Sequence, residues 1–174
     1  MAEYTKGSRP AGRSMITLEP LSEKNFVAVT KLEVSFDQAG FVAPNVFSIT
    51  ESKVFNYLMP RVLRRGKKAV GFALYGQDPS SERYYIVRLM IGASFQGQGF
   101  GREAVRLMVA EIQARNGRPC AVYLRVMPDN TRAVALYEGL GFEATGEVDG
   151  GEVVYHLDET KAAAINQPLA PCTN

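Results

Sequence analysis

The sequence predicts an α/β (α+β) protein with one mixed β-sheet of six to seven strands and helices on both faces. Three observations predict this class. Tyr84–Ile91 and Ala121–Val126 are apolar runs of the kind found in buried strands. Between them, apolar residues from Ala104 to Ile112 recur at helical spacing, so strand, helix and strand should form a right-handed crossover. Asp149-Gly150-Gly151 separates two further strand-like segments and indicates a hairpin.

The other elements follow in chain order. Ser48, with Glu51 three residues later, has the pattern of a capped helix, and Pro60 is expected to end that helix. Asn116-Gly117 should end the helix of the crossover. The remaining expectations are a strand at Ile16–Leu21, a helix from Ser22 to about Val34, a loop at Phe36–Val46, strands at Arg61–Arg65 and Lys68–Tyr75, a helix at Asn130–Gly139, and strands at Glu143–Val148 and Glu152–Leu157.

Composition bounds the class of protein. A chain of 174 residues suits one domain, and a net charge of +2 gives no reason to expect a nucleic-acid partner. We interpret the basic cluster from Arg61 to Lys68 as a solvated strand end and turn. The two cysteines, Cys120 and Cys172, have no metal-ligand spacing, so neither a metal site nor a disulfide framework is expected.

We expect three regions: a flexible leader at 1–14, a folded domain at 15–158 and a C-terminal tail at 159–174. No run approaches the roughly 20 apolar residues of a membrane span. The N-terminus also lacks the apolar segment of a secretory signal. We therefore expect a cytoplasmic protein without a membrane partner.

The segment after Tyr84–Ile91 carries the chemistry. Three glycines, Gly97, Gly99 and Gly101, lead into the helix of the crossover. Glycines allow backbone N–H groups to approach an anion, and a helix start adds unpaired N–H groups and partial positive charge. This arrangement predicts a phosphate cradle. Arg102 stands where the dinucleotide-binding pattern G-x-G-x-x-G needs its third glycine, so that pattern does not match.

Gln96-x-x-Gly99-x-Gly101 and the later segment from Asn130 to Phe142 are two motifs that resemble those of the GNAT acetyltransferase superfamily. Gln96-x-x-Gly99-x-Gly101 is similar to its pyrophosphate-binding signature, R/Q-x-x-G-x-G/A. Farther on, the segment from Asn130 to Phe142 is similar to the family pattern N-x-x-A-x-x-x-Y-x-x-x-G-F. The resemblance covers roughly Ile16 to Asp158 and implies the GNAT fold, whose two central parallel strands splay apart.

Three segments carry a closer resemblance: Phe41-Val42-Ala43-Pro44-Asn45-x-x-Ser48, Arg88-Leu89-Met90-Ile91 and the glycine-rich segment. Together they resemble the bacterial diamine and spermine/spermidine N-acetyltransferase branch. The chain departs from the branch at Gly92, where an aspartate is usual.

The resemblance implies acetyl-CoA as the cofactor and direct attack of a neutral amine on its thioester. The backbone of the Leu89–Ile91 strand would pair with the pantetheine arm, and Tyr137 would be the acid beside the departing sulfur. The implied cofactor-binding residues are Leu89, Met90, Ile91, Gln96, Gly97, Gln98, Gly99, Phe100, Gly101, Arg102, Asn130, Ala133 and Tyr137.

A proton must also leave the amine. An alkyl amine has a pKa of about 10.4, so only about one in two thousand molecules is neutral at pH 7. Carboxylates are expected near the cationic acceptor. The candidates for base or acceptor contact are Glu33, Asp37, Glu51, Glu82 and Tyr85, and Asn45 and Ser48 would shape the acceptor wall.

Three functions remain open from the sequence. The first is transfer of an acetyl group to a polyamine or diamine such as spermidine or spermine. The second is transfer to another amine: an amino acid, an aminoglycoside-like amine or a peptide N-terminus. The third is an acetyl-CoA-binding module without catalysis, which the loss of the aspartate at Gly92 would permit. Because members of the superfamily often dimerise, a homodimer is also expected.

Overall fold

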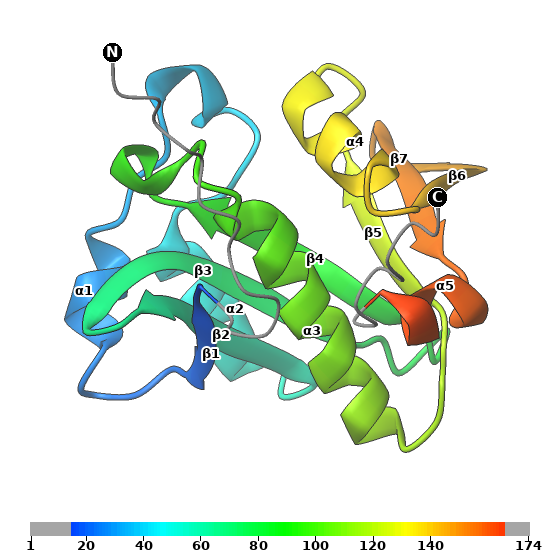
Figure 1. Cartoon of the computed structure of the whole chain (residues 1–174), viewed down its shortest axis with the longest axis horizontal. Coiled ribbons are helices and arrows are strands. Elements are labelled where there is room, and N and C mark those ends of the chain that lie inside the picture. The colour runs from blue at the N-terminus through cyan, green and yellow to red at the C-terminus, as the bar shows by residue number, and fades with distance from the viewer. Residues whose placement is uncertain (1–14, 166–174) are drawn as a thin grey trace, which may run out of the picture.

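A seven-stranded mixed sheet organises the protein (Figure 1). The computed structural model describes residues 15–165; the predicted leader, Cys172 and residues 166–174 of the predicted tail lie outside them. The strand order is β1-β2-β3-β4-β5-β7-β6, and only β4 and β5 are parallel neighbours. The strands are β1 Thr17–Pro20, β2 Leu58–Arg65, β3 Lys68–Gln77, β4 Tyr84–Ile91, β5 Val122–Val126, β6 Glu143–Asp149 and β7 Glu152–Leu157.

Helices cover both faces of the sheet, as the sequence predicts. In Figure 1, α3 crosses in front of the strands, whereas α1 and α2 lie behind β2, β3 and β4. The helices are α1 Phe26–Thr30, α2 Asn45–Val54, α3 Phe100–Asn116, α4 Thr131–Glu138 and α5 Glu159–Ala164. Short 3₁₀ turns occupy Phe36–Gln38 and Ala93–Phe95. Within the described residues, no helix has the length and apolarity needed to cross a membrane.

The longest helix, α3, confirms the periodicity read from the sequence. Its buried side chains belong to Phe100, Ala104, Val105, Met108, Val109 and Ile112. They pack on the front face of the sheet, where β4, β5 and β7 supply the opposite side of the core. Gly117 ends the helix in the left-handed conformation with φ +73°, and its N–H donates to Gln113 O.

The first helix is shorter than expected. Asn25 Oδ1 accepts from Ser22 N–H (2.8 Å) and Asn25 Nδ2 donates to Pro20 O (3.0 Å), so residues 22–25 form a turn. Helix α1 therefore begins at Phe26. After Thr30 the chain turns towards the segment following β4, because the carbonyl of Glu33 accepts from Ala93 N–H at 2.8 Å.

The expected boundaries of the second helix are wrong at both ends. Helix α2 begins at Asn45, and Ser48 lies inside its first turn, where its N–H donates to Pro44 O. Pro60 lies within β2 and does not end the helix. The pairing of β2 with β1 begins only at Arg61, so the missing N–H of Pro60 removes no hydrogen bond on that side.

An ion pair between a buried arginine and a half-buried glutamate joins β2 to α3. Arg61 Nε lies 3.0 Å from both carboxylate oxygens of Glu111, and Nη2 lies 2.5 Å from Oε1. The guanidinium also stands 5.6 Å from the ring centre of Tyr75 on β3. Arg61 is 7% exposed, so interpreting the Arg61–Lys68 cluster as solvated is wrong for its first residue.

The electrostatics of this pair link folding to pH. Burial pushes the pKa of Glu111 upward, but the hydrogen bonds and charge of Arg61 outweigh it and hold that pKa below its ordinary value of 4.5. A carboxyl group with a lowered folded-state pKa stabilises the fold above its unfolded pKa. That contribution is lost as the pH falls through the folded value.

We therefore expect Glu111→Gln to lower the free energy of unfolding by about 2 kcal/mol at pH 7, because a charged hydrogen-bond partner of Arg61 is removed. The difference from the parent protein should shrink below the pKa of the unfolded carboxyl. Urea unfolding at pH 7 and pH 3.5 measures both values. The control is Glu147→Gln, whose exposed pair with Arg83 should contribute less than about 1 kcal/mol. Equal losses in the two variants would contradict the structural role of the Arg61–Glu111 pair.

Candidate active site

The two central strands separate after a short paired stretch. Strands β4 and β5 pair at Tyr84–Ile86 and Val122–Leu124, and no pairing joins them beyond this point. The pairing with β3 shifts at Val87, since Leu74 is opposite Arg88 while Tyr75 is opposite Ile86. A residue inserted in this way bends its strand. The predicted gap between the central parallel strands is confirmed.

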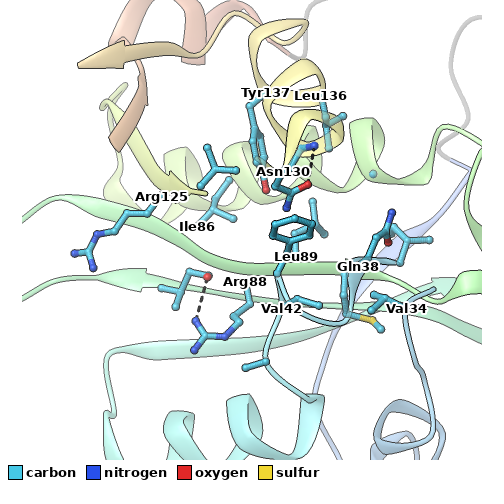
Figure 2. Close-up of a pocket in the computed structure, with 18 of the residues that line it drawn as sticks. Val34, Gln38, Val42, Ile86, Arg88, Leu89, Arg125, Asn130, Leu136 and Tyr137 are labelled. Atoms are coloured by element: carbon cyan, nitrogen blue, oxygen red, sulfur yellow. Dashed lines mark hydrogen bonds between the residues drawn. The ribbon is translucent and has the colours of Figure 1, made fainter. Parts of the chain in front are cut away.

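A cavity of about 1060 Å³ opens at this gap (Figure 2). Its walls are the second half of β4, the end of β5, the glycine-rich segment, α4 and the segment from Gln38 to Pro44. The volume is that of a pocket for a large ligand. Unpaired backbone groups along β4 can hydrogen-bond to an extended ligand in the way an added strand would.

The glycine-rich segment presents its amides at one end of the cavity. Gly97 and Gly99 have φ angles of +73° and +83°, and Gly99 is the N-cap of α3. Glu103 N–H is the first amide to be satisfied, by Gly99 O at 3.2 Å. Within residues 15–165, no acceptor is bonded to the amide N–H groups of residues 97–102. These N–H groups and the helix dipole suit a diphosphate.

Arginine side chains flank the same end of the cavity. Arg102 Nη1 donates to Gly139 O at 2.7 Å, so this side chain ties α3 to the end of α4. Arg132, which the sequence analysis did not single out, donates to Gln96 Oε1 at 2.9 Å. Of the predicted cofactor-binding residues, only Gln98 does not line the cavity; its Oε1 accepts from Arg65 Nη1 instead.

Helix α4 brings three predicted residues to the other side of the gap. Asn130 caps the helix, since its Oδ1 accepts from Ala133 N–H at 3.2 Å. Tyr137 lies about two turns farther along the same helix face, is 8% exposed, and packs its ring edge against Phe142. Figure 2 shows the Tyr137 hydroxyl directed into the cavity close to Asn130. Burial raises the pKa of Tyr137 to about 12, so the phenol is protonated at neutral pH.

The predicted acceptor-side residues divide into two groups. Tyr85 and Glu51 line the cavity, whereas Glu33, Asp37, Asn45 and Glu82 do not. Asn45 has a packing role: it is 5% exposed, and its Nδ2 donates to Val29 O at 2.9 Å and to Met90 Sδ at 3.6 Å. Asp37 and Glu82 are exposed, in the 3₁₀ turn and in the turn before β4 respectively. Ser48 is buried within α2.

Sequence reasoning missed four charged residues on this side: Arg88, Arg125, Asp78 and Glu152. Arg88 Nη2 lies 3.2 Å from Glu51 Oε2, and Arg125 Nη1 lies 3.0 Å from Asp149 Oδ2. A hydrogen bond from the Ser80 backbone, with others from the Ser80 and Ser81 hydroxyls, holds the pKa of Asp78 below its usual range. The signal for Arg88 was present in the sequence, because this residue begins the Arg88–Ile91 motif.

The structure leaves little free space for a side chain at Gly92, where the resembled branch usually has an aspartate. A Cβ placed at Gly92 would lie 3.1 Å from Leu32 Cδ2 and 3.3 Å from Phe95 Cδ2. Gly92 N–H donates to Val70 O, and the residue does not line the cavity. Apolar side chains therefore surround the position where the carboxylate of the resembled branch would begin.

Comparison with known proteins identifies the class to which this fold and site belong. Residues 29–142 match the model of the acetyltransferase (GNAT) family, and the chain belongs to that family. It is an N-acetyltransferase, and acetyl-CoA is its acetyl donor.

Three individual proteins illustrate what the chain is similar to within this family and fold. The spermine/spermidine N(1)-acetyltransferase of Bacillus subtilis is 27% identical over 146 residues, which cover 80% of this chain and 95% of that protein. The solved spermidine N-acetyltransferase of Vibrio cholerae, in complex with CoA and spermine, has a TM-score of 0.68 at 18% identity, covering 87% and 99% of the two chains. The aminoglycoside acetyltransferase AAC(6′)-Ib in complex with coenzyme A has a TM-score of 0.69 at 17% identity, covering 84% and 96%. At identities of 18% and 17%, the likeness to these two solved structures shows that this chain shares their fold.

The backbone of Gly99 gives a test of the phosphate cradle. At φ +83° a side chain is strained, and the space around its Cβ is open except for Met15 Cε at 3.6 Å. We expect Gly99→Val to weaken CoA binding at least about tenfold, because strain and bulk both act beside the free amides. Isothermal calorimetry with CoA measures this change. Gly150→Val, at φ +59° in the β6–β7 turn outside the cavity, is the matched control and should bind CoA like the parent. Unchanged affinity in a folded Gly99→Val protein would refute the cradle.

Proposed function

We propose that the acceptor of this N-acetyltransferase is a polyamine or diamine of the spermidine and spermine type. The observation that carries the proposal is the balance of charges at the acceptor end of the cavity, where α2, β3, β5 and β7 meet. Both arginines there, Arg88 and Arg125, have carboxylate partners. Asp78 and Glu152 also line the cavity and form no ion pair within 4.0 Å among residues 15–165, although the charge of Arg125 acts on Asp78. The unpaired charges are therefore negative, and they favour a ligand with several ammonium groups.

The relatives support the same acceptor. The Bacillus subtilis protein named spermine/spermidine N(1)-acetyltransferase is matched over 95% of its length. Tyr85 adds an aromatic surface beside Arg125, whose guanidinium lies 5.2 Å from the ring centre. Methylene chains between the ammonium groups of a polyamine can pack against such a ring.

A second candidate is an aminoglycoside, which also carries several amino groups. The likeness to AAC(6′)-Ib and the size of the cavity support it. The unpaired carboxylates do not separate these two acceptors, because both ligands are polycations. The homodimer expected from the sequence stays a prediction.

Glu51 is our candidate for the group that receives the proton of the acceptor ammonium. Its Oε2 is buried in the cavity wall and accepts no hydrogen bond among the described residues, although Arg88 Nη2 lies 3.2 Å away. A carboxylate held in this way can accept a proton directly or through one water molecule. The neutral amine then attacks.

Tyr137 is our candidate for the group beside the leaving sulfur. Acetyl-CoA supplies the activated acetyl group as a thioester. One C–N bond forms and one C–S bond breaks. The first proton passes from the ammonium through Glu51 to solvent; a second leaves the nitrogen as the amide forms, and it balances the proton that the CoA thiolate takes up from solvent on release as a thiol. Tyr137, with a pKa of about 12, keeps its proton at neutral pH. Because a simple thiol has a pKa of about 8.5, complete proton transfer from this phenol is uphill, and its main role is to donate a hydrogen bond to the thiolate.

We expect Tyr137→Phe to lower kcat by about a hundredfold, because the donor beside the thiolate is lost. The Kd for acetyl-CoA should change less than about threefold, since the ring still fills the same space. Steady-state kinetics and calorimetry measure the two quantities. Tyr155→Phe, which removes a tyrosine hydroxyl from outside the cavity, is the control and should leave kcat unchanged. Parallel loss of kcat and affinity in Tyr137→Phe would mean that the tyrosine only packs.

A panel of amines tests the acceptor class. With thiol release as the assay, we expect spermidine and spermine to give a kcat/KM at least about tenfold above those of lysine and a peptide N-terminus. Glu152→Gln should raise the KM for spermidine about three- to tenfold, because one unpaired charge is removed. Glu159→Gln, on the exposed first turn of α5, is the control and should have no such effect. An aminoglycoside turned over faster than spermidine would favour the second candidate.

A further inference from the structure

The side chain of Gln96 joins three walls of the cavity. Its Nε2 donates to Ile91 O at 3.0 Å and to Gln38 Oε1 at 2.8 Å, while its Oε1 accepts from Arg132 Nη1 at 2.9 Å. The orientation of the amide follows from its partners, since a backbone carbonyl can only accept and a guanidinium can only donate. Both the nitrogen and the oxygen of the Gln96 amide are therefore engaged in hydrogen bonds.

The three partners belong to different functional parts. Ile91 ends β4, which forms one edge of the gap, and Arg132 lies in the first turn of α4, the helix that carries Tyr137. Gln38 begins the segment from Gln38 to Pro44, which lines the cavity and leads into α2, the helix that carries Glu51. Figure 2 shows Gln38 and Val34 on the wall opposite Tyr137 and Leu136.

The segment of residues 36–43, which we call the acceptor loop, has few other attachments. Its backbone hydrogen bonds within the described residues are local, from Gln38 to Ser35, from Ala39 to Phe36 and from Phe41 to Gln38. Phe36 at its start is 98% exposed. Among residues 15–165, the bond from Gln96 to Gln38 is the one hydrogen bond that ties this loop to the cofactor side.

We infer that Gln96 is a positioning residue that couples the cofactor site to the acceptor loop through Gln38. The inference rests on the proposed function, because it assigns the loop to the acceptor. Gln96 directly precedes the free amides of residues 97–102, so a ligand that fixes those amides also fixes its side chain. Gln96 then holds the acceptor loop in place, and CoA raises the affinity for the amine. By linkage, the amine raises the affinity for CoA by the same factor.

The test removes the loop end of this bond and leaves the cradle intact. In Gln38→Leu we expect the KM for spermidine to rise about three- to tenfold, the size expected for one hydrogen bond, while kcat and the Kd for CoA change less than about twofold. Gln38→Glu keeps an acceptor at the same reach and should restore the parent KM. Gln113→Leu removes a comparable amide from a pairing with Cys120 at the far end of α3, and should leave the KM unchanged.

A second readout does not depend on the identity of the amine. The chain contains no tryptophan, so Phe36→Trp places a single fluorophore on the acceptor loop. We expect CoA alone to change its emission, and we expect Gln38→Leu to abolish that change although calorimetry still detects CoA binding. A parent KM with an unchanged fluorescence response in Gln38→Leu would overturn the coupling, as would a Phe36→Trp protein whose emission ignores bound CoA. If CoA changes the emission but spermidine is not acetylated, the proposed acceptor fails and the coupling stands.

Discussion

The site exists because two parallel neighbours in the middle of a sheet stop pairing. Strands β4 and β5 share three register positions and then diverge, leaving backbone groups of β4 without a strand partner. Unpaired backbone groups in a protein interior are costly unless another molecule satisfies them. The bulge at Val87 bends β4 at the point of divergence, and α3 and α4 begin on either side of the opening. The free amides of the cradle, the cap at Asn130 and the phenol of Tyr137 all take their positions from this opening.

Stability and function lie in different parts of the molecule. The pair of Arg61 and Glu111 joins β2 to α3 on the side away from the cavity, and the apolar stripe of α3 covers the paired half of the sheet. These contacts stabilise the part of the sheet that borders the gap between β4 and β5. The proposed acceptor side is built differently, with charged side chains and a loop that has few attachments. A rigid cofactor side and an adjustable acceptor side suit an enzyme whose donor is constant and whose acceptor must be selected.

The sequence predicted the glycine-rich turn and the cavity-facing side of α4 because the signals for these local structures are themselves local. Glycines at 97 and 99 have the positive φ angles that glycine permits, and the spacing of Asn130, Ala133 and Tyr137 fixes one helix face. The acceptor side could not be predicted in this way. Asn45 was selected by its type, but its amide is used by Val29 and Met90 from other elements. The position of Arg88 beside Glu51 depends on a bulge, and no local pattern in the sequence reveals that bulge. Pro60 likewise was expected to end a helix, because proline is a common helix breaker. Its place within β2 is possible because β1 pairs with β2 only from Arg61 onward, and the sequence does not reveal where that pairing begins.

The acceptor loop is fixed at both ends by contacts that do not involve its own side chains. The carbonyl of Glu33 holds the chain before it to Ala93, and Asn45 fastens the start of α2 to Val29 behind it. Apart from Gln38, residues between these two anchors can therefore change in type or number without disturbing the sheet or the glycine-rich segment. Mutation and selection confined to one short stretch could redirect such an enzyme from one amine to another while its use of coenzyme A is inherited unchanged.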